Sequence, residues 1–234
     1  MLQNIIDNSR NIVFFGGAGV STESGLPDFR SQDGLYSMKY DVPPETILSR
    51  TYFERHTEKF FDFYRDKMLF LDAKPNAAHL ALSRAEKAGR LSAVVTQNID
   101  GLHTAAGSRT VYELHGSVHR NYCMRCGKPY TAEYILNSAG VPLCDCGGII
   151  KPDVVLYEEP LDSKVCDAAI NAVSAADTLI VAGTSLTVYP AAGMINYFKG
   201  DNLVLINRDE TPMDSLASLV IHDKVGEVLG KINF

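Results

Sequence analysis

Four of the five cysteines fall into two close pairs whose spacing suits a metal ion. Two residues separate Cys123 from Cys126, and one residue separates Cys144 from Cys146. Paired thiolates of this kind bind Zn²⁺ tetrahedrally at about 2.3 Å, and four of them leave no position for a reactive water. We therefore expect a closed, structural zinc site. Cys166 lies in a half-apolar segment and is interpreted as a buried, inert thiol.

His115 is the best candidate for a general base. It follows a short apolar run at residues 110–114 and precedes a glycine, so its side chain can point into an open cleft. Imidazole titrates near neutral pH, which suits proton transfer, although a lone histidine is more often structural. The other histidines have weaker claims: His79 lies within an expected helix, and His119 is interpreted at most as a neighbour of the zinc site.

A glycine-rich loop, Gly16-Gly17-Ala18-Gly19, follows the apolar run at residues 12–15. Glycine has no Cβ, so the loop backbone can approach a ligand closely and its amides can bind a pyrophosphate. A buried strand that empties into such a loop is typical of dinucleotide sites. Thr22 stands where the third glycine of the usual fingerprint belongs, so the loop alone also fits an ordinary tight turn.

Polar side chains follow several other apolar runs. Gln97, Asn98 and Asp100 come directly after the run at residues 92–95, and Gly183-Thr184-Ser185 follow the run at residues 178–182. In open α/β sheets, ligands bind outside the carboxyl ends of the strands. We therefore expect these residues near a cofactor, together with Asn207, whose amide at another strand end suits a ribose hydroxyl.

The elements that position these groups are short apolar runs separated by helical stretches. Six β-rich runs lie at residues 11–15, 92–95, 110–114, 178–182, 203–206 and 219–221. Most are continuous rather than alternating, as in strands buried on both faces. Helices are expected over 75–89, 163–176 and 190–198. This alternation predicts an α/β fold, a doubly wound, Rossmann-like parallel sheet.

Two segments break the alternation. Residues 31–74 form an aromatic-rich helical insertion, and residues 117–157 hold the four paired cysteines and little apolar content. The aromatic stripe favours core packing between helices over ligand binding. We expect both insertions to form a small domain, with residues 1–30, 75–116 and 158–234 forming the Rossmann-like domain.

Composition limits the possible partners. The chain has 234 residues and a formal net charge of −6, with no clustered basic run, which argues against nucleic-acid binding. Its first residues lack the apolar stretch of a signal peptide, and no run approaches the roughly 18 apolar residues of a membrane span. We expect a cytoplasmic protein with no membrane association, and a monomer.

Taken together, the motifs resemble one family, the sirtuins, which are NAD-dependent protein deacylases. The resemblance covers nearly the whole chain, in the family's order, and its compact length is similar to the bacterial form. Besides the cysteines, it is carried by GAGVSTESGLPDFR (17–30), TQNIDGLH (96–103), ELHGS (113–117), KPDVV (151–155), GTSLTVYPAA (183–192) and INRDE (206–210).

The resemblance implies a role for each matching residue. Those implied to bind NAD are Gly17, Ala18, Gly19, Thr22, Asp28, Phe29, Arg30, Gln97, Asn98, Ile99, Asp100, Gly183, Thr184, Ser185, Asn207 and Val225. Those implied to bind the substrate peptide, as an added strand between residues 155–159 and 187–190, are Val155, Tyr157, Glu158, Val188 and Tyr189. His115 and Asn98 are the implied catalytic residues.

The implied reaction consumes NAD rather than using it as a hydride carrier. The amide oxygen of an acyl-lysine displaces nicotinamide at C1′ of the ribose, and His115 then deprotonates a ribose hydroxyl. The products are free lysine, nicotinamide and O-acyl-ADP-ribose. Two other interpretations stay open from the sequence: an ADP-ribosyltransferase of the same fold, and an NAD-binding sensor without catalysis.

The chain departs from the family pattern at three places, one of which is Gly16 before the usual Gly-Ala-Gly, interpreted as loosening only the entry to the loop. Tyr157 and Glu158 stand where the family more often has phenylalanine and glycine, so peptide docking and acyl choice are the least certain transfers. The Cys144-Asp145-Cys146 pair is one residue shorter than usual, although all four ligands are present. The protein substrates and the preferred acyl chain do not follow from the sequence.

Overall fold

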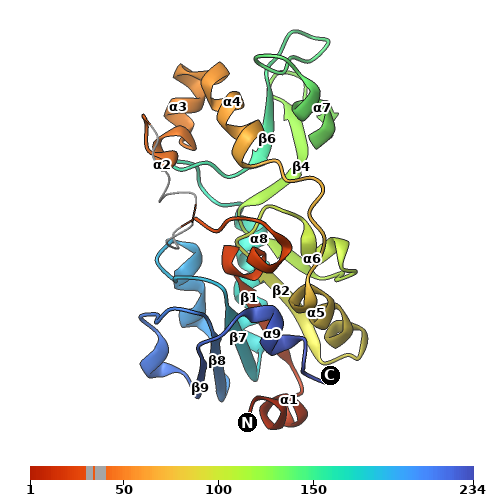
Figure 1. Cartoon of the computed structure of the whole chain (residues 1–234), viewed down its shortest axis with the longest axis vertical. Helices are drawn as coiled ribbons and strands as arrows, with labels where there is room; N and C mark the ends of the chain where they lie inside the picture. Colours follow the sequence, from red (N-terminus) through yellow and green to blue (C-terminus); the bar gives the residue numbers. More distant parts are fainter. Residues whose placement is uncertain (30–33, 35–40) are drawn as a thin grey trace.

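The computed structural model describes residues 1–29, 34 and 41–234. Its larger part, the large region, is built on a six-stranded sheet with the order β3-β2-β1-β7-β8-β9 and parallel pairing throughout (Figure 1). Its strands are β1 (Ile12–Gly16), β2 (Leu91–Thr96), β3 (Val111–Glu113), β7 (Thr178–Ala182), β8 (Asn202–Ile206) and β9 (Leu219–Ile221). The predicted doubly wound parallel sheet is confirmed, with each of its six strands in place.

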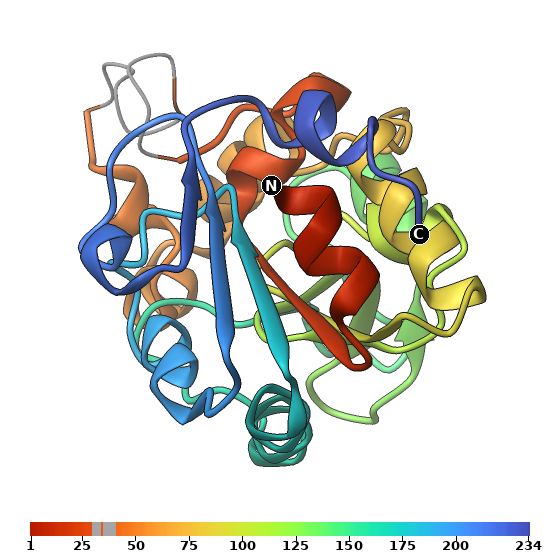
Figure 2. The ribbon, with the colours of Figure 1, turned by 90° about the horizontal axis from the view of Figure 1, so that it is seen from below.

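Helices cover both faces of this sheet, as Figure 2 shows. On one face, α1 (Leu2–Asn8), α5 (Ala77–Lys87) and α9 (Val225–Leu229) pack over a core that includes Phe14 and Ile180. On the other face, α8 (Ser163–Ala175) and the 3₁₀ helix η4 (Ala191–Tyr197) pack over Val13, Phe15 and Val181. Successive strand residues therefore face opposite cores, which explains why the strands are continuously apolar.

Local sequence explains where the two longest of these helices begin. Asn76 caps α5, since its side chain accepts from the Ala78 amide and its own amide donates to His79 Nδ1. Asp162 caps α8 by accepting from the amides of Lys164 and Val165. The expected helix at 190–198 is present, but as the tighter 3₁₀ form.

Among the residues that the structure describes, the small region contains a three-stranded antiparallel sheet and four helices. The sheet has the order β5-β4-β6. Its elements are β4 (Gly116–Cys123), β5 (Pro129–Tyr130), β6 (Ile150–Val154), α2 (Pro44–Ile47), α3 (Arg50–Arg55), α4 (Thr57–Lys67) and α7 (Ala132–Asn137). Phe53, Phe60, Phe61 and Tyr64 form its fully buried aromatic core, as the helical stripe predicted.

Four further short elements lie within the described residues. They are η1 (Ala18–Val20), η2 (Thr22–Ser24), α6 (Leu102–Ala105) and η5 (Asp214–Leu216). Both termini lie at the end of the large region that is away from the small region (Figure 1). Within the described residues, no helix is long and apolar enough to cross a membrane.

Candidate functional site

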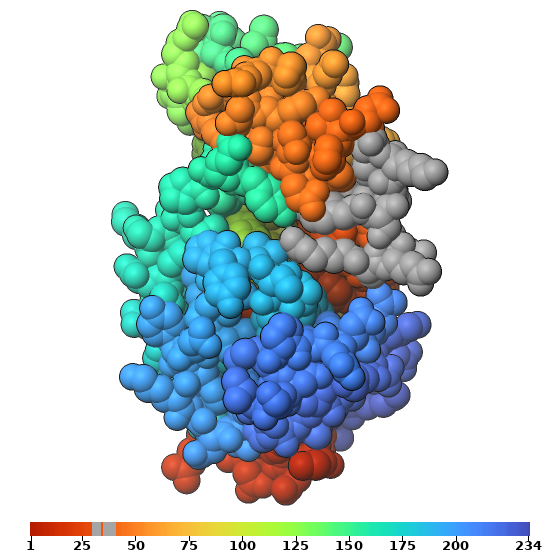
Figure 3. Space-filling model, turned by 90° about the vertical axis from the view of Figure 1, so that its left-hand side faces the viewer, coloured from red at the N-terminus to blue at the C-terminus, as the bar shows by residue number. Residues whose placement is uncertain are grey.

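A cavity of about 450 Å³ lies between the two regions, at the carboxyl ends of the parallel strands. Every residue implied to bind NAD or peptide contributes to its lining, with the exception of Arg30, which falls outside the described residues. His115 also lines it. In Figure 3 the flank of the molecule is hollowed between the teal chain around residues 155–160 and the light-blue chain around residues 184–190. The fold therefore gathers the sequence-predicted residues into one site.

The cavity opens at the point where the strand order reverses, between β1 and β7. Such switch points are where open α/β sheets bind ligands, because the loops of the two neighbouring strands diverge there. Here the loop after β1 carries Gly17 and Gly19, and the loop after β7 carries Gly183.

These glycines allow the two loops to meet. A Cβ on Gly17 or Gly19 would lie 2.8 Å from atoms of Gly183 or Thr184, and Gly183 itself has φ of 58°. The Gly17 amide donates to the Ala182 carbonyl at 3.1 Å, and the Gly19 amide donates to the Gly183 carbonyl at 2.9 Å. The sequence suggested that loop amides bind a ligand; in the structure these two amides already have protein partners, and the glycines serve loop packing.

A hydrogen-bonded cluster lies where β2 ends. The Ser21 hydroxyl donates to Asp100 Oδ2 at 2.6 Å and accepts from Asn98 Nδ2 at 3.0 Å, while the Leu102 amide donates to Asp100 Oδ1 at 2.9 Å. These bonds fix the orientation of the Asp100 carboxylate and the Asn98 amide in the cavity wall. Sequence reasoning did not single out Ser21, although it lies inside the glycine-rich motif.

His79 supports the same cluster from helix α5. Its Nδ1 accepts from the Asn76 amide, so its proton is on Nε2, which faces Ser21 Oγ at 3.5 Å. Burial lowers the pKa of His79 to about 4, and burial places the pKa of the neighbouring His103 well below its usual value. Both rings are therefore neutral at physiological pH, which agrees with a structural role for these two histidines.

His115 has the geometry of a general base. Its Nδ1 lies 2.9 Å from the Gln97 carbonyl oxygen, which can only accept, so Nδ1 carries the proton and Nε2 keeps its lone pair. Burial lowers the pKa of His115, and the hydrogen bond to Gln97 opposes that shift. The ring is therefore neutral at pH 7 and able to accept a proton.

The residue after His115 turns the chain out of the parallel sheet. Gly116 has φ of 74°, and a Cβ there would clash with the Asp153 carbonyl. The chain leaves β3 through His115 and enters β4 of the small region, so this histidine stands at the junction of the two sheets. The Val155 amide donates to the His115 carbonyl at 3.0 Å, which ties the segment after β6 to the same junction.

Residues 155–159 form one wall of the cavity and are tied to the helical insertion. The Tyr157 amide donates to the Leu48 carbonyl, and the Arg50 amide donates back to the Tyr157 carbonyl. The Glu159 carboxylate contacts Arg50 and Lys151, each at 3.0 Å, and accepts from the Leu156 amide. Val188 and Tyr189 line the same cavity, and Tyr189 is 72% exposed.

The segments after β8 and before α9 also line the cavity. Arg208, which follows β8, lies 3.6 Å from the Asp28 carboxylate of the segment after η2. Asn207 Nδ2 donates to the Asp209 carbonyl, and Val225 is buried at the start of α9. These residues come from strand and helix ends that are distant in sequence, yet they line one space.

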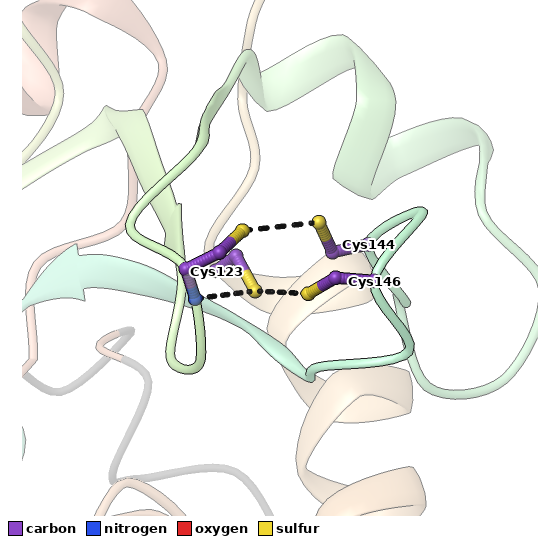
Figure 4. Close-up of side chains that lie close together, drawn as sticks. Cys123, Cys144 and Cys146 are labelled. Atoms are coloured by element: carbon purple, nitrogen blue, oxygen red, sulfur yellow. Dashed lines mark hydrogen bonds between the residues drawn. The ribbon is translucent and has the colours of Figure 1, made fainter.

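The four cysteines form a cluster in the small region. Figure 4 labels three of them, Cys123, Cys144 and Cys146. The Sγ atoms of Cys123 and Cys146 lie 3.5 Å apart, those of Cys126 and Cys144 lie 3.6 Å apart, and all four lie within 4.8 Å of one another. Tetrahedral Zn²⁺ with bonds of about 2.3 Å places sulfurs about 3.8 Å apart, so the donor set fits zinc despite the short Cys144–Cys146 spacing.

Two expectations about neighbouring residues need correction. His119 is no part of the metal cluster; its Nε2 instead lies 3.0 Å from the Asp100 carbonyl oxygen. Cys166 is half-buried rather than buried, because it lies at the edge of the core under α8. Burial and nearby carboxylates raise the pKa of the Cys166 thiol, which keeps it protonated and unreactive.

Comparison with known proteins identifies the family. A sequence model of the Sir2 family matches residues 17–190. Proteins named NAD-dependent protein deacetylase from Clostridium acetobutylicum and Clostridium perfringens are each 61% identical to the chain; the matches cover 97% and 99% of this chain and 95% and 96% of those proteins.

Solved structures agree with this assignment. A Sir2 complex with a deacetylated p53 peptide and 3′-O-acetyl ADP-ribose superimposes with a TM-score of 0.91 at 41% identity, covering 97% of this chain and 94% of that one. A Sir2 complex with a p53 peptide and NAD⁺ has a TM-score of 0.87, also at 41% identity, over the same shares of the two chains. The chain therefore belongs to the Sir2 family, the sirtuins.

Proposed function

We propose that this protein is an NAD-dependent protein-lysine deacetylase. The observation that carries the proposal is the position of His115, neutral and with Nε2 unprotonated, in a cavity at the switch point of a Rossmann-like sheet. Relatives at 61% identity bear the name of this activity, and a similar Sir2 structure holds NAD⁺ with a peptide. Both facts support the same reaction.

NAD is a consumed substrate in this proposal. The loops after β1, β7 and β8, which line the cavity, would hold its pyrophosphate and adenosine, and Asn98 and Asp100 would hold the nicotinamide end. The Ser21 hydrogen bonds support this placement, because they hold the carboxylate and the amide in fixed orientations before the substrate arrives. Phe29, at the edge of the aromatic core, covers the nicotinamide end.

The substrate peptide lies between residues 155–159 and 187–190 in the proposed complex, and its acyl-lysine enters the cavity beside Val155. The amide oxygen of the acyl-lysine displaces nicotinamide from C1′ of the ribose, forming a carbon–oxygen bond while the glycosidic bond breaks. An amide is a weak nucleophile, so the residues of this chain contribute mainly alignment and the exclusion of water.

His115 acts as the general base after nicotinamide has left. Its Nε2 takes the proton of a ribose hydroxyl, whose oxygen then attacks the acyl carbon. The Gln97 carbonyl holds the ring by its Nδ1 proton, which keeps Nε2 available. A positioned base of this kind contributes on the order of 10²–10⁴ in rate. The acyl carbon–nitrogen bond then breaks, and the lysine amine leaves with the proton that Nε2 had taken. Water adds to the acyl carbon, and the carbon–oxygen bond between that carbon and the oxygen on C1′ breaks, which leaves O-acyl-ADP-ribose.

The four cysteines hold a structural zinc ion in this proposal. Their sulfur spacing supports it, and a set of four thiolates leaves no coordination position for catalysis. We also infer that the two sheets mark two domains with the boundaries expected from the sequence. The protein is proposed to act in the cytoplasm, where thiols stay reduced, and as a monomer without nucleic acid.

Mass spectrometry of an acetyl-lysine peptide incubated with and without NAD tests the proposal. The expected result is NAD-dependent loss of the acetyl group, with one nicotinamide and one O-acetyl-ADP-ribose formed per lysine. An ADP-ribosylated protein in place of those products would contradict it and favour a transferase. NAD binding with no turnover of acetyl, longer or acidic acyl chains would also contradict it and favour a sensor.

A further inference from the structure

Glu158 occupies an unusual place in the cavity wall. It is one of only two non-glycine residues with positive φ among those that the structure describes, at 74°, the other being Leu186. A left-handed backbone favours glycine, so a side chain is kept at this position against the local conformational preference. Backbone outliers of this kind cluster at functional sites, and Glu158 lines the cavity.

One contact fixes where the carboxylate lies. The Thr51 amide, in the first turn of α3, donates to Glu158 Oε2 at 2.9 Å. Hydrogen bonds from Thr51 lower the pKa of Glu158, so the group is charged at neutral pH. The bond also holds the side chain in place, although the residue is exposed.

The carboxylate of the adjacent residue, Glu159, differs from that of Glu158 in having ion-pair partners. Arg50 and Lys151 each lie 3.0 Å from the Glu159 carboxylate, so that charge is neutralised within the protein. In the described part of the chain, Glu158 has no such ion pair, and Arg55 acts on it only at longer range. Glu158 therefore presents at the cavity wall a negative charge that no ion pair among the described residues neutralises.

We propose that Glu158 selects acyl-lysine substrates that carry an arginine or lysine close to the acyl-lysine. This inference rests on the proposed function, because it places the peptide beside residues 155–159. A basic side chain of a bound peptide would form an ion pair with the Glu158 carboxylate, and Tyr189 exposes an aromatic ring from residues 187–190, the other segment beside the proposed peptide. An acidic side chain at the same peptide position would be repelled.

A peptide scan tests the proposal. A neutral acetyl-lysine peptide receives one arginine, or one glutamine as its uncharged match, at each position from two before to two after the acetyl-lysine. The measurements are kcat/KM and, independently of turnover, the Kd of the peptide in the presence of NAD. We expect arginine to be preferred over glutamine by about two- to five-fold at one position or more, as for exposed ion pairs.

Variants of Glu158 test whether the arginine preference depends on its carboxylate. Glu158→Gln keeps an acceptor for the Thr51 amide and removes only the charge, and Glu158→Gly removes the whole side chain at a backbone angle that glycine adopts freely. Both are expected to abolish the arginine preference. Glu58→Gln, the same chemical change on an exposed α4 residue outside the cavity lining, is expected to retain it.

Salt provides a second readout. Raising the ionic strength from about 0.1 M to about 1 M shortens the screening length from about 10 Å to about 3 Å, so the arginine preference should shrink in the unmodified protein. Equal arginine preference in the unmodified protein and the Glu158→Gln variant, or none in either, would overturn the proposal. Absence of turnover on every peptide would instead contradict the deacetylase function, and the Kd values would still decide the role of Glu158.

Discussion

The two regions of the molecule are held together by different kinds of side chain. The large region buries aliphatic residues on both faces of a parallel sheet, such as Val13, Ile180 and Val181. The small region relies on a cluster of aromatic rings and on four cysteines. The first region therefore carries its core in its strands, whereas the second combines an aromatic core with four cysteines that could hold a metal ion.

Removal of zinc should give the largest difference between the regions. Structural zinc contributes on the order of 10 kcal/mol in small domains, so the Cys144→Ser variant or a chelator should unfold residues 116–154 locally. We expect fast hydrogen exchange there, slow exchange in β1 and β7, and loss of deacetylation. Cys166→Ser should leave zinc content and exchange unchanged. Slow hydrogen exchange in β4 of the zinc-free protein would contradict the idea that the small region depends on the metal.

The second-largest effect should come from truncating a ring in the aromatic core of the small region. Phe60 is fully buried and packs edge-on against Phe53 and Phe61. Phe60→Ala should lower the free energy of unfolding by about 3–5 kcal/mol, because a large cavity forms among rings that cannot all close on it. Urea denaturation followed by circular dichroism measures this. Phe70→Ala, at a side chain that is 40% exposed, is the control and should cost far less.

Acid should weaken the large region through its buried histidines. Burial lowers the pKa of His79 to about 4 and holds the pKa of His103 well below its usual value. The unfolded chain binds these protons near pH 6.5, so stability is present above that pH and is lost as the pH falls. Each histidine contributes a slope of about 1.4 kcal/mol per pH unit, down to pH 4 for His79.

A variant separates this slope from acid release of zinc. His103→Leu should reduce the dependence of unfolding free energy on pH by about 1.4 kcal/mol per unit between pH 6.5 and 5, measured by urea denaturation at each pH. Zinc release acts equally on both proteins and cancels in the difference. If the unfolding free energy of both proteins depended equally on pH, His103 would be protonated in the folded chain, which would contradict this prediction.

The smallest effect should come from a helix cap in the large region. Asp162 accepts from two amides at the start of α8, at 2.9 and 3.0 Å. Asp162→Ala should lower the free energy of unfolding by about 1 kcal/mol in urea denaturation. Asp167→Ala, farther along the same helix and exposed, is the matched control. Equal losses in the two variants would mean that the cap bonds contribute nothing.

The strands were predictable because their signal is local. Each buried strand is a continuous apolar run, so the six runs and their intervening helices were enough to predict the parallel sheet. The polar site residues at strand ends followed from the same logic, since the ends of parallel strands meet at one edge. Others, such as Phe29, Val155 and Val225, were implied only by the resemblance to the sirtuins. The short helices of the helical insertion were harder to predict. Ser49 caps the start of α3, and His56, with a non-helical backbone, separates α3 from α4; apolar periodicity reveals neither boundary.

Contacts between distant residues could not be predicted. Ser21 meets Asn98 and Asp100 only because β1 and β2 are neighbours, and nothing in the glycine motif indicates that bond. Glu158 holds the first turn of α3 across 107 residues of sequence. The departure from the family pattern at Glu158 was visible in the sequence, whereas its positive φ and its Thr51 partner required coordinates.

The most direct test of the account is product analysis for a His115→Ala variant. The two regions meet at His115, and its Nε2 is the proposed proton acceptor. With an acetyl-lysine peptide and NAD, mass spectrometry should find deacetylated peptide and O-acetyl-ADP-ribose reduced by about 10²–10⁴ relative to the unmodified protein, while NAD binding persists. Unchanged formation of both products by the variant would contradict the assignment of His115 as the base.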